Sequence, residues 1–135
     1  MNTAQQIAKH LREIHFGGNW TSSNLKDSLA DVTWQQAVTQ VYSFNTIATL
    51  VYHTHYFVSA VLKLLQGGPL DAHDKFSFAH PPIDSQQDWE KLLQKVFSDA
   101  EYTCLGEKAT YRLRNGPLMI TPSLPLILAS EIISF

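Results

Sequence analysis

Six histidines and a single cysteine are the main residues of this chain that could hold a metal or take part in nucleophilic chemistry. A catalytic zinc ion needs about three protein ligands and one open position. His53 and His55 are two positions apart on a predicted helix, so their side chains point roughly 200° apart around its axis. They therefore cannot bind one ion inside a helical bundle, and His10 and His15, five positions apart, also diverge.

A site at His53 would need ligands from distant parts of the chain. The nearest candidates in the sequence are His73, Asp71, Asp74 and Asp84. No spacing rule supports that set, so His53 is either a metal-ligand position or a buried neutral imidazole with a hydrogen bond. For His55 a core or lid role is favoured. His73 and His80 are most simply loop residues, and the segment from 71 to 74 reads as a turn and helix cap.

Other catalytic signatures are weak. Cys104 falls near the end of a predicted helix, where the helix dipole opposes a thiolate, which argues against a nucleophile there. The chain has no nucleophile elbow, no P-loop and no glycine-rich dinucleotide motif. Lys108, Arg112 and Arg114 form a brief basic patch, which in a slightly acidic protein is more typical of a solvated face than of a phosphate site.

The composition is that of one soluble globular domain spanning residues 1–135. The chain is 44% hydrophobic and 16% charged, with a net charge of −2, which excludes a strongly basic nucleic-acid surface. A lone cysteine cannot form an internal disulfide, and the N-terminus lacks the apolar region of a signal peptide, so we predict a cytoplasmic protein. The longest apolar stretch, Asn45–Gln66, contains two histidines, several hydroxyl residues and Lys63, so we predict a buried helix and no membrane contact.

That stretch is the element around which the rest must be arranged. Its apolar residues recur at helical spacing, and the opposite face is almost as apolar. A soluble helix that is apolar nearly all round is expected to be covered on most sides. The core-facing positions are Ile47, Leu50, Val51, Thr54, Val58, Val61, Leu62 and Leu65.

Two further long helices and two short ones are predicted. The first long helix starts at a Thr3 cap and runs to about Phe16, with Ile7, Leu11 and Ile14 as its inner stripe. The last opens at Ser85 and runs to roughly Cys104, with an apolar stripe that includes Trp89 and Val96. Short helices are expected at Leu25–Ala30 and Trp34–Val41. The pattern predicts an all-α, antiparallel bundle of three long helices.

Residues 106–135 form a divergent tail in this interpretation. After Asn115-Gly116-Pro117 the sequence is apolar, contains Pro122 and Pro125, and carries one charge, Glu131. It does not predict an amphipathic helix like the others. At most, Leu126–Ser134 is expected to form one short apolar element, and so apolar an end would have to fold back on the bundle or be covered by another subunit.

Seven short stretches, collinear over about three-quarters of the chain, match a known family pattern: His15-Phe-Gly-Gly-Asn-Trp-Thr21, Asn24-Leu-Lys-Asp27, Asp31-Val-Thr-Trp34, Tyr42-Ser-Phe-Asn-Thr-Ile47, Leu50-Val-Tyr-His53, Gln66-Gly-Gly-Pro-Leu-Asp-Ala-His-Asp-Lys75 and Asp88-Trp-Glu-Lys91. Through these stretches the chain resembles the DinB/YfiT-like superfamily of metal-dependent enzymes. The resemblance implies a four-helix bundle with a long crossover, often dimeric. It also implies thiol-dependent transferase or isomerase chemistry.

In that superfamily three histidines typically hold a divalent metal, one from the second long helix and two from an H-x-x-x-H pair on the fourth. His53 falls at the first of these positions. The other two are missing, because His80 is the last histidine of the chain. Either the site has been lost naturally, or the sequence after Asp99-Ala100 is a truncated or frameshifted reading.

Two functions follow as hypotheses. The first, favoured for this polypeptide, is a non-enzymatic bundle that self-associates, as a dimer, through an exposed apolar face. The second is a metal-dependent, thiol-linked transferase or hydrolase that uses His53 as a ligand. No cofactor is predicted unless further ligands complete a zinc or nickel site, and as written the chain is expected to bind divalent metal weakly or not at all.

Overall fold

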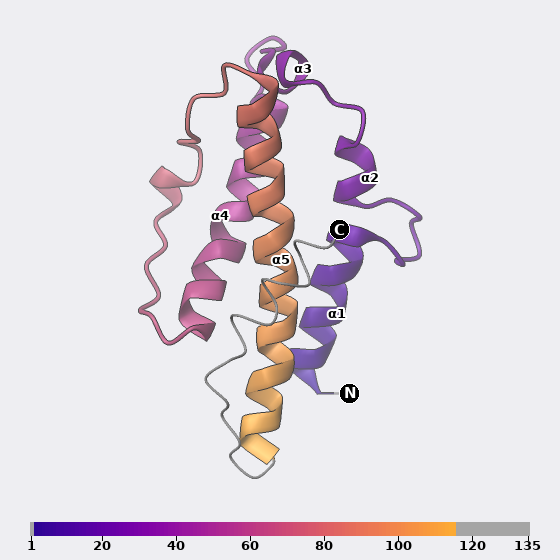
Figure 1. Ribbon diagram of the computed structural model, residues 1–135, viewed down its shortest axis with the longest axis vertical. Helices are drawn as coiled ribbons and strands as arrows, with labels where there is room; N and C mark the ends of the chain where they lie inside the picture. The colour runs from indigo at the N-terminus through magenta and orange to yellow at the C-terminus, as the bar shows by residue number, and fades with distance from the viewer. Residues whose placement is uncertain (1, 116–135) are drawn as a thin grey trace.

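The computed structural model describes the backbone of residues 2–115 and the side chains of residues 2–105. Its helices are α1 (Thr3–Phe16), α2 (Leu25–Leu29), α3 (Trp34–Val38), α4 (Ile47–Leu65), a short 3₁₀ helix η1 (Asp74–Phe76) and α5 (Gln86–Asn115). Within residues 2–115 all regular secondary structure is helical (Figure 1), which confirms the all-α prediction. The short apolar element predicted at Leu126–Ser134 lies outside the described residues.

Side-chain caps start the helices close to the predicted positions. Asn2, rather than Thr3, caps α1: its side chain accepts a hydrogen bond from the Gln5 N–H at 2.8 Å, and the Gln5 side chain bonds back to the Asn2 N–H. This reciprocal pair satisfies two donors that a helix start otherwise leaves free. Asn24 caps α2, as expected, and Thr33 caps α3, for which the sequence leaves Asp31 or Thr33 open.

The boundaries of α4 also depend on local chemistry. Its cap is Thr46, where the sequence predicts Ser43 or Asn45, and the Thr46 side chain accepts a hydrogen bond from the Thr49 N–H. The helix ends before Gly67, whose φ of +90° is a conformation that glycine adopts without steric cost. The long helix predicted at 45–66 is therefore present, two residues shorter at its start and one at its end.

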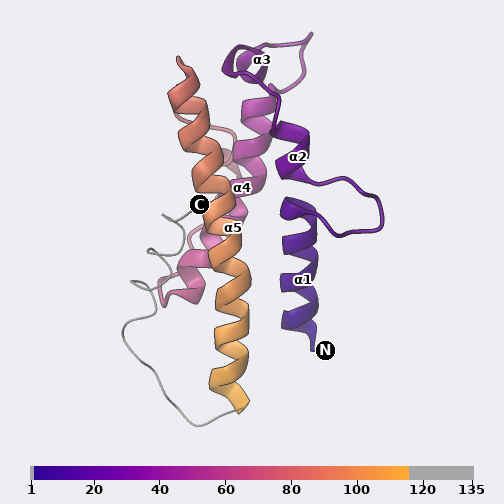
Figure 2. The ribbon, with the colours of Figure 1, turned by 45° about the vertical axis from the view of Figure 1, so that its right-hand side comes forward.

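The long helices are not all antiparallel. Figures 1 and 2 show α1 running in one direction, and α4 and α5 both running in the other. Residues 66–85, which include η1, form a crossover that returns the chain from the end of α4 to the start of α5. The predicted antiparallel arrangement is thus wrong for α4 and α5. A long crossover is what the resemblance implied.

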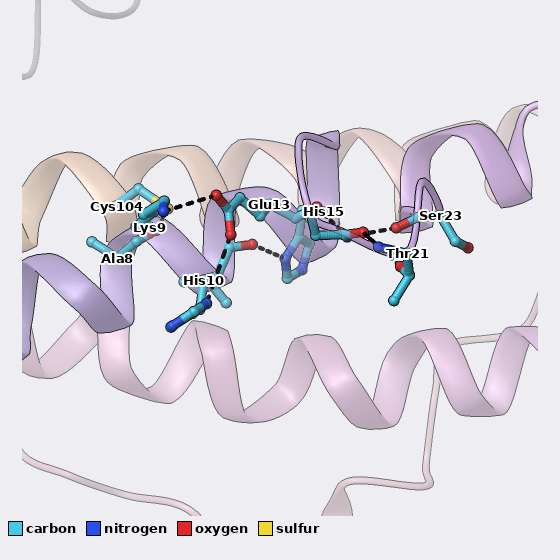
Figure 3. A network of polar contacts seen from close by, with 10 residues as sticks. Ala8, Lys9, His10, Glu13, His15, Thr21, Ser23 and Cys104 are labelled. Atoms are coloured by element: carbon cyan, nitrogen blue, oxygen red, sulfur yellow. Dashed lines mark hydrogen bonds and ion pairs between the residues drawn. The ribbon is translucent and has the colours of Figure 1, made fainter.

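The central helix is α5, not α4. It packs against α4 on one side and α1 on the other, whereas α1 and α4 do not pack extensively against each other. On the α1 side, Cys104 Sγ lies 3.5 Å from the Ala8 carbonyl oxygen (Figure 3), and Arg12 donates to Glu101 at 2.6 Å. Cys104 therefore lies inside α5, at a helix contact.

The core lies between α4 and α5, and it extends to the end of the bundle that α2 and α3 cover. Trp89 is fully buried there, and its indole N–H donates to the Val32 carbonyl at 2.9 Å. Val96 and Ala100 are buried too, which confirms the predicted inner stripe of the last long helix. The buried residues that form this core cluster are Leu29, Ala37, Ala48, Val51, Ile83, Trp89 and Val96.

Two predicted apolar stripes are only partly buried. Ile7 and Ile14 of α1 are each 57% exposed, because Ala8 and His15 form the buried side of that helix instead. On α4, Leu50 is 49% exposed and Val61 and Leu64 are also exposed. The expectation that this helix is covered on most sides is therefore wrong within the described residues, because a single long helix, α5, covers it.

The last helix is longer than predicted. It continues past Cys104 and Gly106 to Asn115, so the first part of the predicted irregular tail has a helical backbone. One glycine inside a helix costs only about 1 kcal/mol relative to alanine, and the first proline comes at Pro117. The basic residues at 108, 112 and 114 thus lie on helical backbone.

None of the described helices is long and apolar enough to cross a membrane.

Candidate functional site

His53 lies on the side of α4 that faces the crossover. Its ring stacks on Phe78 with 4.2 Å between centroids and meets the Phe57 ring edge-on. Its Nδ1 is 2.8 Å from the Ser77 hydroxyl. Because the Ser77 hydroxyl donates to the Asp74 carbonyl at 2.6 Å, its oxygen is left to accept a hydrogen bond from His53 Nδ1–H. That tautomer leaves Nε2 as the nitrogen with a lone pair.

The described residues do not complete a metal site at His53. No group of three or more histidine, cysteine, aspartate or glutamate side chains in that part of the chain could hold an ion. Of the proposed long-range ligands, Asp71 instead contacts His73 at 3.0 Å, and Asp84 donates its backbone N–H to Asp88. The Ser77 hydroxyl thus orients the His53 ring as a partner of a metal ligand would, but the described residues lack the further ligands that a catalytic metal needs.

His55 is the histidine that the fold places in a charged, buried environment. It is 4% exposed, and its Nε2 lies 2.7 Å from Asp99 Oδ2 on α5. Lys95, one turn earlier on α5, donates to the same oxygen at 2.9 Å. The three side chains link α4 to α5. The other ring nitrogen, Nδ1, is buried and has no hydrogen-bond partner among the described residues.

The Asp99 carboxyl group is held in its charged form. Burial by itself would raise its pKa, but the hydrogen bonds from His55 and Lys95, with the positive charge of Lys95, outweigh burial and lower the pKa below the usual value for aspartate. Ionised Asp99 accepts Nε2–H of His55 and so fixes the orientation of the ring. In neutral His55 the lone pair is then on Nδ1.

A pocket of about 490 Å³ lies next to this group, between α4, α5 and the crossover. Tyr52, His55 and Tyr56 contribute from α4, the crossover contributes Pro81 to Ile83, and α5 contributes Leu92. Three lysines also line it: Lys63, Lys91 and Lys95. His53 is not among the lining residues, so the predicted ligand position and the pocket are separate places on α4.

The other histidines have local partners. His15 Nδ1 is 2.8 Å from the Leu11 carbonyl, and His10 is paired with Glu13 at 3.7 Å (Figure 3). His80 Nδ1 contacts the Pro81 carbonyl. These positions do not come together with His53, which agrees with the sequence argument against a shared site.

A row of exposed and mostly apolar residues runs along α4 on the side away from the pocket. Its members alternate three and four positions apart, which is the spacing of a helix-pairing seam. All of them are exposed. We call this row the α4 stripe; it consists of Ile47, Leu50, Thr54, Phe57, Val61 and Leu64.

Sequence reasoning missed the pair of His55 and Asp99 because the two residues are 44 positions apart. One signal could have found it. Asp99 falls at helical spacing with Val96 and next to Ala100, so it is an acid on the apolar side of its helix. A histidine in an apolar helix is a natural partner for such an acid.

Comparison with protein families, curated proteins and solved structures finds no match for the chain.

Proposed function

We propose that this chain is a bundle of the DinB/YfiT-like four-helix type whose described part supplies three of the long helices. In a four-helix bundle each helix contacts two neighbours. Here α5 has two long neighbours, whereas α1 and α4 each pack extensively only on α5. Exposed apolar residues, Ile7 and Ile14 on α1 and the α4 stripe on α4, leave each of these helices with an apolar face that no described helix covers. The crossover between parallel α4 and α5 supports the same assignment.

Its proposed function is self-association into a homodimer through the α4 stripe. The observation that carries this proposal is the uncovered row from Ile47 to Leu64, about 25 Å long at 1.5 Å per residue. The row contains no charged residue, and its 3.5-residue period suits side-by-side pairing of two helices. Two copies related by a twofold axis would each bury the same stripe. The buried Cys104 is compatible with the cytoplasmic location that we also propose.

A second copy is a better occupant of the stripe than the chain's own last residues. Residues 116–135 are apolar enough to compete, but their sequence includes Pro117, Pro122 and Pro125. Proline interrupts helices, so that sequence does not predict a helix as long as the stripe. The net charge of −2 adds little repulsion between two copies.

The test is the mass of the full chain in solution, measured by light scattering after size exclusion. The wild type is expected at twice the mass of one chain. Leu50→Glu, which places a charge in the stripe of both copies, should weaken the dimer roughly a hundredfold or more. Leu70→Glu is the matched control, because Leu70 is 63% exposed in the crossover and outside the stripe; this variant should remain dimeric.

A third measurement distinguishes a second copy from the chain's own last residues as the partner that covers the α4 stripe. A chain that stops after Asn115 should still form the dimer, and circular dichroism should show that its helices are intact. If the full chain is a monomer and only the shortened chain associates, the stripe is covered by the chain's own end and the proposal is wrong.

Metal-dependent, thiol-linked transfer or hydrolysis at His53 is the second candidate. What favours it is the hydrogen bond to Ser77, which leaves Nε2 of His53 available as a ligand atom. One imidazole is too few for a catalytic site, so we expect calorimetric titration with Zn²⁺ or Ni²⁺ to give weak binding that His53→Ala does not change. Tight binding that His53→Ala abolishes and the exposed His10→Ala keeps would instead favour the enzyme.

A further inference from the structure

The pocket between α4, α5 and the crossover uses one face of α4. Tyr52, Tyr56, Ser59 and Lys63 line it, and because they recur three or four positions apart they share one side of the helix. At 3.6 residues per turn, this side is opposite the α4 stripe. The crossover runs along the outer side of α4 (Figure 1). His53 does not line the pocket either, so neither proposed function uses it.

The pocket's two unpaired lysines lie far apart, toward its opposite ends. Helices α4 and α5 run in the same direction (Figures 1 and 2) and are in register where His55 meets Asp99. Lys63 is eight positions after His55, and Lys91 is eight positions before Asp99. At 1.5 Å per residue, the two lysine backbones are therefore about 24 Å apart along the helices. They cannot bind one small charged group together.

The charges of the lining also balance. Asp71 and Asp88 line the pocket together with the two lysines. The third lysine, Lys95, is already paired with Asp99 at 2.9 Å. A ligand with a net charge would lose hydration here without meeting a matching excess of opposite charge. The lining therefore favours an uncharged molecule.

The wall between the charged ends is aromatic and apolar. Tyr52 and Tyr56 contribute their rings from α4, with 6.4 Å between the ring centroids. Pro82 and Ile83 contribute from the crossover, and Leu92 from α5. Aromatic side chains pack favourably on other flat rings, edge-on or offset. This lining favours an aromatic ligand over a flexible aliphatic one.

Two hydroxyl groups in the lining have no hydrogen-bond partner among the described residues. They belong to the half-buried Tyr52 and Ser59. The Tyr56 hydroxyl, by contrast, accepts the His73 N–H at 2.9 Å and holds the crossover against α4. Because a hydroxyl can both donate and accept, the two remaining ones suit a ligand with a single polar group.

We propose that this pocket binds an uncharged aromatic molecule of one or two rings that carries one hydrogen-bonding group. Tyr52 and Tyr56 contact the rings, and the hydroxyls of Tyr52 and Ser59 bind the polar group. The volume of about 490 Å³ is within the range of about 300–1,000 Å³ typical of ligand pockets. A cavity of about 150 Å³ already holds benzene, so two fused rings have room. This binding does not depend on self-association.

The experiment is an NMR titration of the isotope-labelled full chain with four probes. Indole is the uncharged aromatic probe, tryptamine its cationic relative, indoleacetate its anionic relative, and cyclohexanol the uncharged probe without an aromatic ring. Indole is expected to bind with a Kd below about 1 mM and to shift amide signals of the pocket lining. The other three probes should bind at least about threefold more weakly, because they add a charge or lack the ring.

Substitutions in the lining separate ring contact from charge. Tyr52→Ala should weaken indole binding roughly five- to tenfold and Tyr52→Phe, which keeps the ring, roughly twofold. Tyr42→Ala is the matched control, because Tyr42 is 88% exposed and outside the pocket; it should change nothing. Lys63→Ala and Lys91→Ala should leave the affinity for indole within about twofold of the wild type.

Two further variants keep the test decisive. Ser59→Phe, at a half-buried position of the lining, fills the pocket from α4 and should abolish binding while the circular dichroism stays unchanged. Leu50→Glu should alter the mass of the particle but not the affinity for indole. The proposed pocket and the proposed dimer can therefore fail separately.

Three results would overturn the proposal. Tighter binding of tryptamine or indoleacetate than of indole would mean that the pocket selects an ion. Equal binding of cyclohexanol would mean that it takes any apolar molecule. Absence of indole binding, or an unchanged affinity in both Tyr52→Ala and Ser59→Phe, would remove the site altogether.

Discussion

The two sides of α4 have similar composition but different surroundings. Toward α5, Ala48, Val51 and Leu62 are buried. On the other side, the α4 stripe carries residues of the same kinds and is exposed. The contrast is sharpest at two consecutive residues, since Val51 is 4% exposed and Leu50 is 49% exposed.

This contrast teaches that apolar composition does not decide which side of a helix is covered. What distinguishes the two sides is the partner that one of them meets. Trp89 and Val96 of α5 pack in the same core cluster as Val51, and the Asp99 carboxylate accepts a hydrogen bond from His55. The described residues offer the stripe nothing comparable, so its apolar area remains available for association.

The largest expected effect comes from Trp89→Ala, which removes the side chain at the centre of the covered side. The loss of buried area and the cavity left behind should lower the free energy of unfolding by about 3–5 kcal/mol. Trp20→Ala is the control, because Trp20 is 94% exposed and should change it by no more than about 0.5 kcal/mol. Urea denaturation measures both. Similar losses in the two variants would mean that the core is not at α4–α5.

Asp99→Ala should have the next largest effect. It leaves His55 without its only hydrogen-bond partner among the described residues and removes the ion pair of Lys95, so we expect a loss of about 2 kcal/mol. Asp31→Ala, at an exposed acid, serves as the control and should cost little. In a cycle with His55→Ala the two losses should be strongly non-additive. Additive losses would contradict a direct link between α4 and α5.

The consecutive pair Val51 and Leu50 gives a smaller but more specific test. Val51→Ala should cost about 1.5–2 kcal/mol at every protein concentration, because it removes buried methyl groups. Leu50→Ala should cost less than about 0.5 kcal/mol in dilute protein, and more as concentration rises if the stripe pairs two copies. Thermal melts over a concentration series separate the two cases. A concentration-independent loss at Leu50 would argue against pairing.

The smallest expected effect concerns acid. The Asp99 pKa is lower in the folded chain than the value of about 3.9 for an unfolded aspartate. Its contribution to stability is therefore complete above about pH 4 and disappears as the pH falls through the folded-state pKa. Between pH 5 and pH 2, the wild type should lose more stability than Asp99→Asn does. Parallel curves for the two proteins would contradict the charged state assigned to Asp99.

The sequence predicted the helices better than their packing. Local signals, such as the Asn24 cap and the glycine after α4, act over a few residues and can be recognised directly. The exposure of Ile7 and Ile14 could not be predicted, because it depends on where α5 lies. The parallel direction of α4 and α5 had only an indirect signal, which is a connection from 66 to 85 long enough to span the bundle.

For the candidate sites, too, local sequence signals were recognisable and contacts between distant residues were not. His53 was predicted from a resemblance to a family motif, and its contacts with Ser77 and Phe78 depend on how the crossover folds. The pocket was not predicted, because its lining comes from α4, the crossover and α5 together. Pairing His55 with Asp99 required knowledge of helix register, which periodicity within one helix does not contain.

The most direct test of the central claim is isotope-filtered NMR on an equal mixture of labelled and unlabelled full chains. It detects only contacts between copies. We predict contacts from the Phe57 ring of one copy to the methyl groups of Leu50, Val61 or Leu64 of the other. If the stripe shows contacts only to residues of its own chain, in a sample whose mass is that of a single copy, the account of α4 as a pairing helix is contradicted.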